Sequence, residues 1–190
     1  MSEQAIKKIL ITGANGFIGG SLMRYYQNQG QDVVGVDLVG NGDDIVEGDI
    51  SQPDSISQLL TESDVIIHTA ALVSNAMQDS DMWRVNVLAT RNLIQAAKEH
   101  KIRRFVQISS IVAYGNSAEG EIDENHPVHA DGGSYVLTKL ASEHVVLSEQ
   151  ANDDIEVVII RPGDAYGPGS RPWIIAPLEA IAKNQFMLPE

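Results

Sequence analysis

The 190-residue chain has no cysteine, few aromatic residues and half as many basic as acidic residues. Without cysteine it can form no disulfide, no thiolate metal site and no cysteine nucleophile. The sequence points to no metal site. The lack of thiols suits the reducing cytoplasm, where we expect the protein to be.

The charge balance and the lack of long apolar runs limit the possible partners. Lys and Arg total 13 against 26 Asp and Glu, so the net charge is −13. A nucleic-acid function would need a basic patch to overcome this repulsion, and the short cluster from Lys98 to Arg104 is more simply the exposed end of a helix. No run approaches the roughly 20 apolar residues that cross a bilayer. We therefore expect neither a nucleic-acid nor a membrane partner.

Short apolar runs alternate with segments of helical spacing, the pattern of a parallel sheet covered on both faces. The expected strands are 8–12, 32–37, 45–47, 64–69, 104–109 and 156–161. The expected helices between them are 17–29, 53–61, 82–100 and 135–151. This order predicts an α/β fold, a Rossmann-type doubly wound parallel sheet with helices on both faces.

The regular pattern stops after Arg161, so residues 1–163 are expected to form the Rossmann domain. Glycines and prolines then precede an apolar helix, expected over 173–184, whose apolar face has no obvious partner. We expect 164–190 to be the start of a truncated substrate-binding region, and the chain to be a fragment. The polar stretch 114–134 is expected to be a loop over the carboxyl edge of the sheet, where ligands bind in such folds.

A glycine-rich turn follows the first expected strand and opens the first helix. Gly13 permits a tight turn, Gly16 lets the backbone approach a pyrophosphate, and Gly19 lets the helix pack on the strand. The helix N-terminus then presents free N–H groups and a positive dipole end to phosphates. The turn predicts a dinucleotide-binding site, with a purely structural turn as the alternative.

Asp37 ends the second expected strand and bears on the choice of dinucleotide. Its carboxylate can accept both hydroxyls of the adenosine ribose, and it would repel the 2′-phosphate of NADP, with no arginine after it to compensate. The predicted cofactor of residues 1–163 is therefore NAD. Asp49 and Ile50 can flank the adenine, one accepting from its amino group and the other packing on its face. A solvated strand end is the alternative for Asp37.

Tyr135 and Lys139 lie four apart on an expected helix and so share one face. Tyrosine is a poor base at its ordinary pKa of about 10, and a neighbouring cation favours the phenolate. Ser109 and Ser110 end the fifth strand at the same edge as the glycine turn, where a hydroxyl can bind a substrate oxygen. These residues indicate acid–base chemistry, although a surface pair is the alternative for Tyr135 and Lys139.

Several motifs follow one another over almost the whole chain. They are TGANGFIG at 12–19, HTAA at 68–71, Asn86 with Thr90 and Asn92, Ser109-Ser110 with Tyr114-Gly115, Tyr135 with Lys139, RPG at 161–163 and YGPG at 166–169. In this order they resemble the extended short-chain dehydrogenase/reductase family, specifically its NAD-dependent epimerase/dehydratase branch.

The resemblance implies a catalytic role for three residues. Tyr135 would be the acid/base that moves a proton on a substrate hydroxyl while hydride passes between the carbinol carbon and the nicotinamide. Lys139 would bind the nicotinamide ribose and lower the tyrosine pKa. Ser110, four residues before Tyr114, would be the catalytic hydroxyl in preference to Ser109.

The resemblance also implies the cofactor contacts and an oligomer. The contacts would be Gly13, Asn15, Gly16, Phe17, Ile18, Gly19, Asp37, Asp49, Ile50, His68, Ala70, Ala71, Tyr135, Lys139 and Pro162. A hydrogen-bonded core histidine is an equal alternative for His68, and Asn86 would brace the site. Helices 82–100 and 135–151 would form the four-helix contact of a homodimer.

The implied function is that of an NAD-dependent oxidoreductase, epimerase or dehydratase acting on a small-molecule substrate. A non-catalytic NAD-binding sensor or scaffold on the same fold is the alternative. Asp164 stands where nucleotide-sugar epimerases usually have an asparagine that binds the diphosphate. A carboxylate there would repel a diphosphate, so a sterol-like, flavonoid-like or smaller hydroxy or keto compound is also considered.

Overall fold

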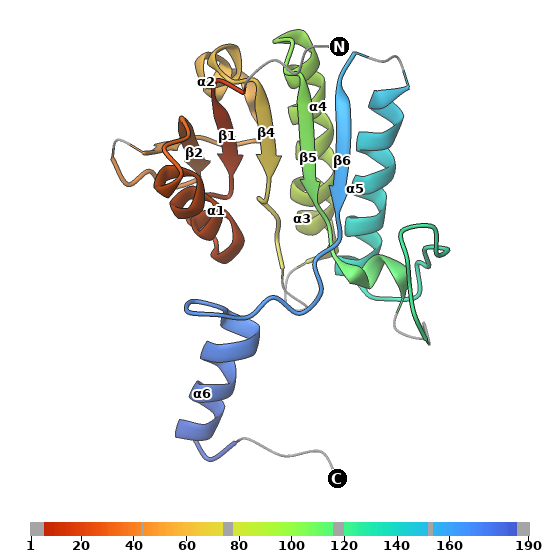
Figure 1. The fold of residues 1–190 in the computed structure, drawn as a ribbon. Helices are drawn as coiled ribbons and strands as arrows, with labels where there is room; N and C mark the ends of the chain where they lie inside the picture. Colours follow the sequence, from red (N-terminus) through yellow and green to blue (C-terminus); the bar gives the residue numbers. More distant parts are fainter. Residues whose placement is uncertain (1–5, 43, 74–77, 116–119, 152–153, 186–190) are drawn as a thin grey trace.

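The computed structural model describes residues 6–42, 44–73, 78–115, 120–151 and 154–185. Its centre is one six-stranded, fully parallel sheet in the order β3-β2-β1-β4-β5-β6 (Figure 1). The strands are β1 (Ile9–Thr12), β2 (Val33–Asp37), β3 (Ile45–Glu47), β4 (Val65–His68), β5 (Arg104–Ile108) and β6 (Glu156–Ile160). The strand order reverses between β1 and β4, and ligands bind at the carboxyl end of such a switch point.

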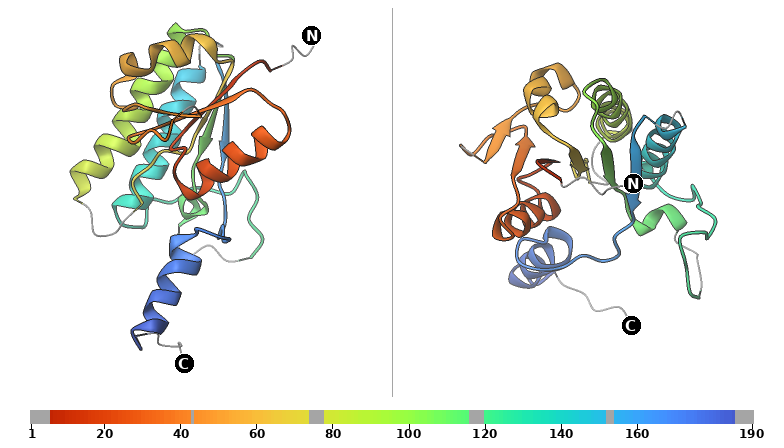
Figure 2. Two further views of the ribbon diagram at one scale, coloured as in Figure 1. Left: turned by 90° about the vertical axis from the view of Figure 1, so that its left-hand side faces the viewer. Right: turned by 45° about the horizontal axis from the view of Figure 1, so that its top comes forward.

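Helices cover the sheet on both faces (Figure 2). On one face lies α1 (Phe17–Asn28), which packs on a cluster that includes Ile11 and Ile67. On the other lie α2 (Ser57–Glu62), α4 (Thr90–Glu99) and α5 (Ser134–Gln150), around a larger cluster centred on Leu10, Ile66 and Phe105. Successive strand residues thus serve opposite cores, as parallel sheets require. The predicted Rossmann-type fold is confirmed.

The expected helix over 82–100 is composite in the structure. It begins as α3 (Asp79–Trp83), continues as a π-helical segment over Arg84–Ala89 and becomes regular in α4. A residue pattern of helical period does not reveal a local change of hydrogen-bond register. The expected helix over 53–61 likewise opens as a 3-10 helix, Pro53–Ile56, before α2.

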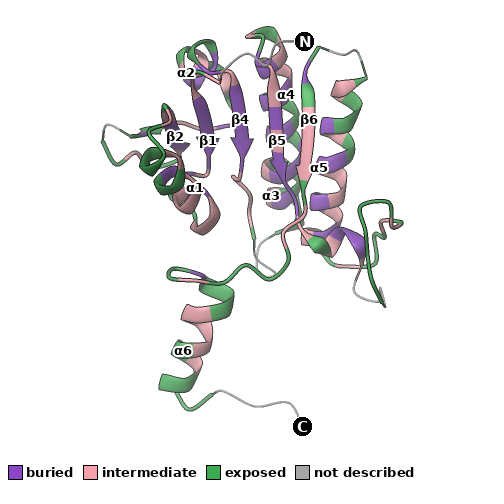
Figure 3. Ribbon diagram, in the orientation of Figure 1, coloured by how far each residue is buried: buried purple, intermediate pink, exposed green. Residues whose placement is uncertain are grey.

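The segment after β6 leaves the body of the sheet. A π-helical segment over Arg171–Ile175 leads into α6 (Ala176–Ala182), which has no buried residue (Figure 3). The apolar side chains of Leu178 and Ile181 are more than half exposed, so α6 is not packed against a hydrophobic core. No helix in the described ranges has both the length and the apolar character needed to cross a membrane.

Candidate functional site

A cavity of about 420 Å³ opens at the carboxyl edge of β1, β2 and β4. Its lining includes these expected cofactor contacts: Gly13, Gly16, Asp37, Asp49, Ile50, Ala70 and Ala71. Val36, Val85 and Ala89 add apolar surface. An apolar slot beside carboxylates and a glycine turn suits an adenosine with its diphosphate, so the residues present fit a dinucleotide.

The glycine turn is held by close backbone packing. Gly13 has a φ of +68°, and a Cβ on it would lie 2.7 Å from the amide nitrogen of Ala70. A Cβ on Gly19 would overlap the carbonyl oxygen of Gly13 and lie 2.8 Å from the hydroxyl oxygen of Thr69. These glycines therefore let β1, α1 and the residues after β4 meet, which agrees with the reason given for each from the sequence.

Asp37 ties the end of β2 to this turn. Its carboxylate accepts the amide N–H of Asn15 at 2.9 Å and that of Leu38 at 2.8 Å. The Asn15 side chain in turn donates to the carbonyl of Val39 at 2.6 Å. Each carboxylate oxygen can accept a further hydrogen bond, so Asp37 keeps the capacity to receive a ribose hydroxyl while it shapes the turn.

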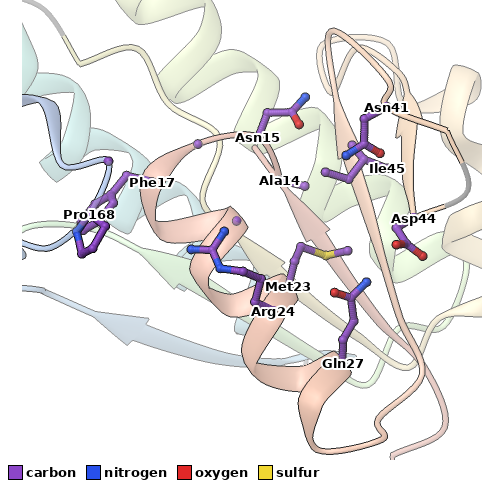
Figure 4. Close-up of a pocket in the computed structure, with 13 residues that line it drawn as sticks. Ala14, Asn15, Phe17, Met23, Arg24, Gln27, Asn41, Asp44, Ile45 and Pro168 are labelled. Carbon is purple, nitrogen blue, oxygen red and sulfur yellow. The ribbon is translucent and has the colours of Figure 1, made fainter.

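Other residues of the glycine motif lie outside this cavity. Asn15 and Phe17 line a separate hollow of about 370 Å³ between α1 and the β2–β3 connection, where Phe17 lies against Pro168 (Figure 4). Ile18 packs on the core cluster beneath α1. Gly16 lines both hollows. The motif therefore serves packing on one side and the cavity on the other.

His68 is a buried, doubly hydrogen-bonded histidine. The Thr90 hydroxyl donates to the carbonyl of Asn86 at 2.8 Å, so it accepts from Nε2–H of His68 at 2.9 Å. Nδ1 then accepts from the hydroxyl of Thr12 at 2.6 Å. Burial, with a smaller effect of the Lys139 cation, lowers the pKa of His68 to about 3. The ring is neutral with both nitrogens engaged, so the geometry favours the core-histidine alternative for its side chain.

Asn86 connects this core to the helix of the expected acid/base. Its side-chain oxygen accepts the amide N–H of Leu72 at 2.7 Å, and its amide donates to the carbonyl of Leu72 at 3.0 Å and the hydroxyl of Thr138 at 3.1 Å. The side chain thus fixes the loop after β4 against α5, in keeping with a bracing role.

The Ser110 hydroxyl lies close enough to Tyr135 to act on its phenol. Burial raises the pKa of Tyr135, and the Ser110 hydroxyl partly opposes this rise. The net direction is opposite to the lowering expected from Lys139, because desolvation of the phenol outweighs the effect of Ser110. The phenol is therefore protonated at neutral pH. Ser109 differs from Ser110, since its hydroxyl is buried without a hydrogen-bond partner in the described part of the chain.

Lys139 is 4% exposed, and its Nζ donates to the carbonyl of Ile108 at 2.7 Å. Burial lowers the pKa of Lys139 to about 8, and the carboxylate of Glu143 acts in the opposite direction. The ammonium group therefore lies at the end of β5, beside the strand that leads to Ser110. Pro162 reaches the same turn, because its carbonyl accepts the amide N–H of Ile111 at 3.1 Å.

The sequence predicted no role for three charged residues of this region. Glu143 and Arg161 form a bidentate ion pair behind Lys139. Arg84 adds a positive charge to the lining of the 420 Å³ cavity at the carboxyl edge of β1, β2 and β4, where it pairs with Asp81 at 3.1 Å. The acid four residues after Lys139 was a usable signal for Glu143, whereas nothing local in the sequence places Arg84 at the cavity.

Comparison with known proteins identifies the family of the chain. A model of the NAD dependent epimerase/dehydratase family matches residues 9–184. The low-salt glycan biosynthesis protein Agl12 of Haloferax volcanii is 30% identical, over 89% of this chain and 60% of its own length. The dTDP-glucose 4,6-dehydratase of Streptomyces niveus is 29% identical, over 90% and 57% respectively.

A solved structure is also similar to this chain. The UDP-glucuronic acid 4-epimerase from Bacillus cereus in complex with NAD superposes with a TM-score of 0.82 at 29% identity, covering 94% of this chain and 64% of that one. The chain spans 57% to 64% of the length of these relatives. Motifs, fold and comparisons together show that the chain belongs to the NAD-dependent epimerase/dehydratase family of extended short-chain dehydrogenases/reductases.

Proposed function

We propose that the protein binds NAD and transfers hydride between a secondary alcohol or ketone carbon and the nicotinamide, with Tyr135 as acid/base. The observation that carries the proposal is that the Ser110 hydroxyl acts on the phenol of Tyr135, with Lys139 buried one turn further along α5. NAD supplies the hydride acceptor or donor when it is bound. The residues Gly16, Asp37, Asp49, Ile50 and Ala70 would hold it, because they line the cavity at the carboxyl edge of β1, β2 and β4.

The protein side of the reaction follows from the state of each group. Tyr135 is protonated at neutral pH because burial raises its pKa, so it is ready to donate from its hydroxyl to a carbonyl oxygen. In the opposite direction the phenolate must be stabilised, and Ser110 and the ammonium group of Lys139 are the groups suited to this. Ser110 would also orient the substrate oxygen. Whether the product is an epimer, a dehydrated compound or a ketone depends on what happens to the oxidised substrate.

The decisive experiment is a substrate screen that follows NADH absorbance and compares Tyr135→Phe with the unchanged protein. Loss of the phenol proton donor should lower the rate by about 10²- to 10⁴-fold with NAD affinity retained. Binding of NAD with no turnover of any alcohol or ketone would instead support a sensor or scaffold. Unchanged turnover in Tyr135→Phe would contradict the role of Tyr135.

The substrate is proposed to lack a diphosphate. Asp164 is exposed where the chain leaves β6, and its carboxylate would repel a diphosphate at that place. We propose that residues 1–163 form the NAD-binding part and that 164–190 begin the substrate-binding part. Calorimetric titration of the NAD-bound protein with UDP-glucose tests whether the substrate lacks a diphosphate. Tight binding of UDP-glucose would contradict that proposal.

We also propose a cytoplasmic homodimer. The helices expected to pair are neighbours that cover one face of the sheet, and Leu88 and Leu147 are 53% and 48% exposed on them. Burying these side chains would favour association by the hydrophobic effect. Light scattering after size exclusion should give twice the chain mass, and Leu147→Glu should give the monomer. A wild-type monomer at high concentration would contradict the dimer.

A further inference from the structure

Glu143 is a buried carboxylate without a part in the proposed reaction. It is 1% exposed and lies one helical turn after Lys139 on α5. Arg161, just after β6, holds both of its oxygens: Nε–H donates at 2.9 Å and an Nη2 proton at 2.7 Å. A buried ion pair contributes little net stability over an apolar pair of the same volume, so stability alone does not explain its presence beside Lys139.

The same guanidinium reaches the turn that carries Ser110. Nη1 of Arg161 donates to the hydroxyl of Tyr114 at 2.8 Å, and its central carbon lies 4.7 Å from the centre of that ring. Tyr114 closes a 3-10 helix, Ile111–Tyr114, that begins directly after Ser110. One charged cluster, Glu143 with Arg161 and Tyr114, therefore ties α5 and the end of β6 to the serine turn.

The charge of Glu143 also acts on Lys139. The ammonium group is buried and has the carbonyl of Ile108 as its hydrogen-bond acceptor. Burial disfavours its charged form, and the Glu143 carboxylate favours that form. The titratable and charged groups around it are Tyr135 and Glu143 on α5, neutral His68 on β4 and, beyond Glu143, Arg161 after β6.

We infer that Glu143 is a positioning residue: through Arg161 and Tyr114 it holds the serine turn against α5, and through its charge it keeps Lys139 in the ammonium form. The inference rests on the proposed roles of Ser110, Tyr135 and Lys139. The planar guanidinium of Arg161 binds Glu143, and the hydroxyl of Tyr114 connects that guanidinium to the serine turn. Each of the two effects is tested by a separate substitution.

The charge effect is tested by titrating Lys139 in protein labelled with ¹³C at lysine Cε, with the signal assigned by Lys139→Arg. Glu143→Gln should move the midpoint to lower pH by about one unit or more. Glu143→Asp, which keeps the charge, should restore the wild-type midpoint. Glu149→Gln is the matched control, since Glu149 is on the same helix but pairs with Lys98 at 3.0 Å. Equal midpoints in Glu143→Gln and the wild type would overturn the inference.

The positioning effect is tested with Tyr114→Phe, which removes the hydroxyl and leaves both charges in place. Amide hydrogen exchange at Ala113 and Gly115 should become several-fold faster, while the Lys139 midpoint stays unchanged. Unchanged exchange would overturn the positioning role. Neither readout needs a substrate, so both effects in a protein that turns nothing over would support this inference and contradict the proposed hydride transfer.

Discussion

Acid destabilisation through His68 is the sharpest test of the structure. The ring is buried and neutral between Thr12 and Thr90, and burial lowers its pKa from the ordinary 6.5 to about 3. In the unfolded chain the histidine takes up a proton near pH 6.5, whereas in the folded chain it does so only near pH 3. The stability from the neutral ring is therefore full above pH 6.5 and is lost as the pH falls.

The size of the loss follows from this difference. Each pH unit between the two pKa values changes the free energy of unfolding by about 1.4 kcal/mol. His68 alone should therefore cost about 2 kcal/mol between pH 6.5 and pH 5, and about 4 kcal/mol at pH 3. Such losses compare with the whole stability of an ordinary domain, about 5–15 kcal/mol.

Urea unfolding at pH 7.5, 6.0 and 5.0 measures the effect. His68→Gln should be less stable at pH 7.5, because buried hydrogen bonds are lost, but its stability should fall less steeply toward pH 5 than that of the wild type. His144→Gln changes an exposed histidine of α5 and should keep the wild-type slope. If His68→Gln falls as steeply as the wild type, the ring is not neutral in the folded protein and the assigned hydrogen-bond pattern is wrong.

Three further changes bear on the cofactor site. Gly19→Ala would press a methyl group into the backbone of the glycine turn and should lower the free energy of unfolding in urea by about 1–3 kcal/mol. The control Gly163→Ala has open space around it and should leave that free energy unchanged. Equal losses of stability in the two variants would contradict the packing role of Gly19. Asp37→Ala should lower the affinity for NAD about tenfold or more in calorimetry, since it removes charged hydrogen bonds. It should also reduce the ratio of NAD affinity to NADP affinity. An unchanged ratio would argue against cofactor selection by Asp37. Arg84→Gln should weaken NAD binding several-fold, because the guanidinium offsets acidic groups of the cavity. Asp81→Asn should strengthen NAD binding. If Arg84→Gln bound NAD more tightly than Asp81→Asn, Arg84 would not face the nucleotide.

Much of the fold was accessible from the sequence because its signals are local. Runs such as Ile9–Thr12 and Val65–His68 are buried throughout and apolar except at their last residue, as is typical of strands buried on both faces. The glycine turn was equally readable, because the steric demands on Gly13 and Gly19 come from chain segments that any β–α turn brings together. The order of strands and helices then leaves few ways to wind the sheet.

The electrostatics of the site could not be predicted in the same way. The pKa of Tyr135 depends on how deeply the phenol is buried, which is a property of the assembled loops and of α5. The partner of Glu143 is Arg161, which lies just after β6 and 18 residues further along the chain. The contact of Ile18 with the core cluster also follows from how α1 is rotated on the sheet. Spacing along the chain does not encode these distances.

The π-helical segment over Arg84–Ala89 makes the site sensitive to the length of the chain. It carries the cavity residues Arg84, Val85 and Ala89 together with the bracing Asn86. Compared with a regular helix, such a segment holds one additional residue in its turn, and one residue of an α-helix corresponds to about 100° of rotation. Deleting one residue here would let the segment close to a regular helix with α3 and α4 still in phase, whereas adding a further residue would turn α3, with the cavity rim, relative to α4. An insertion in this segment should therefore weaken cofactor binding even when every cavity side chain is kept in the sequence.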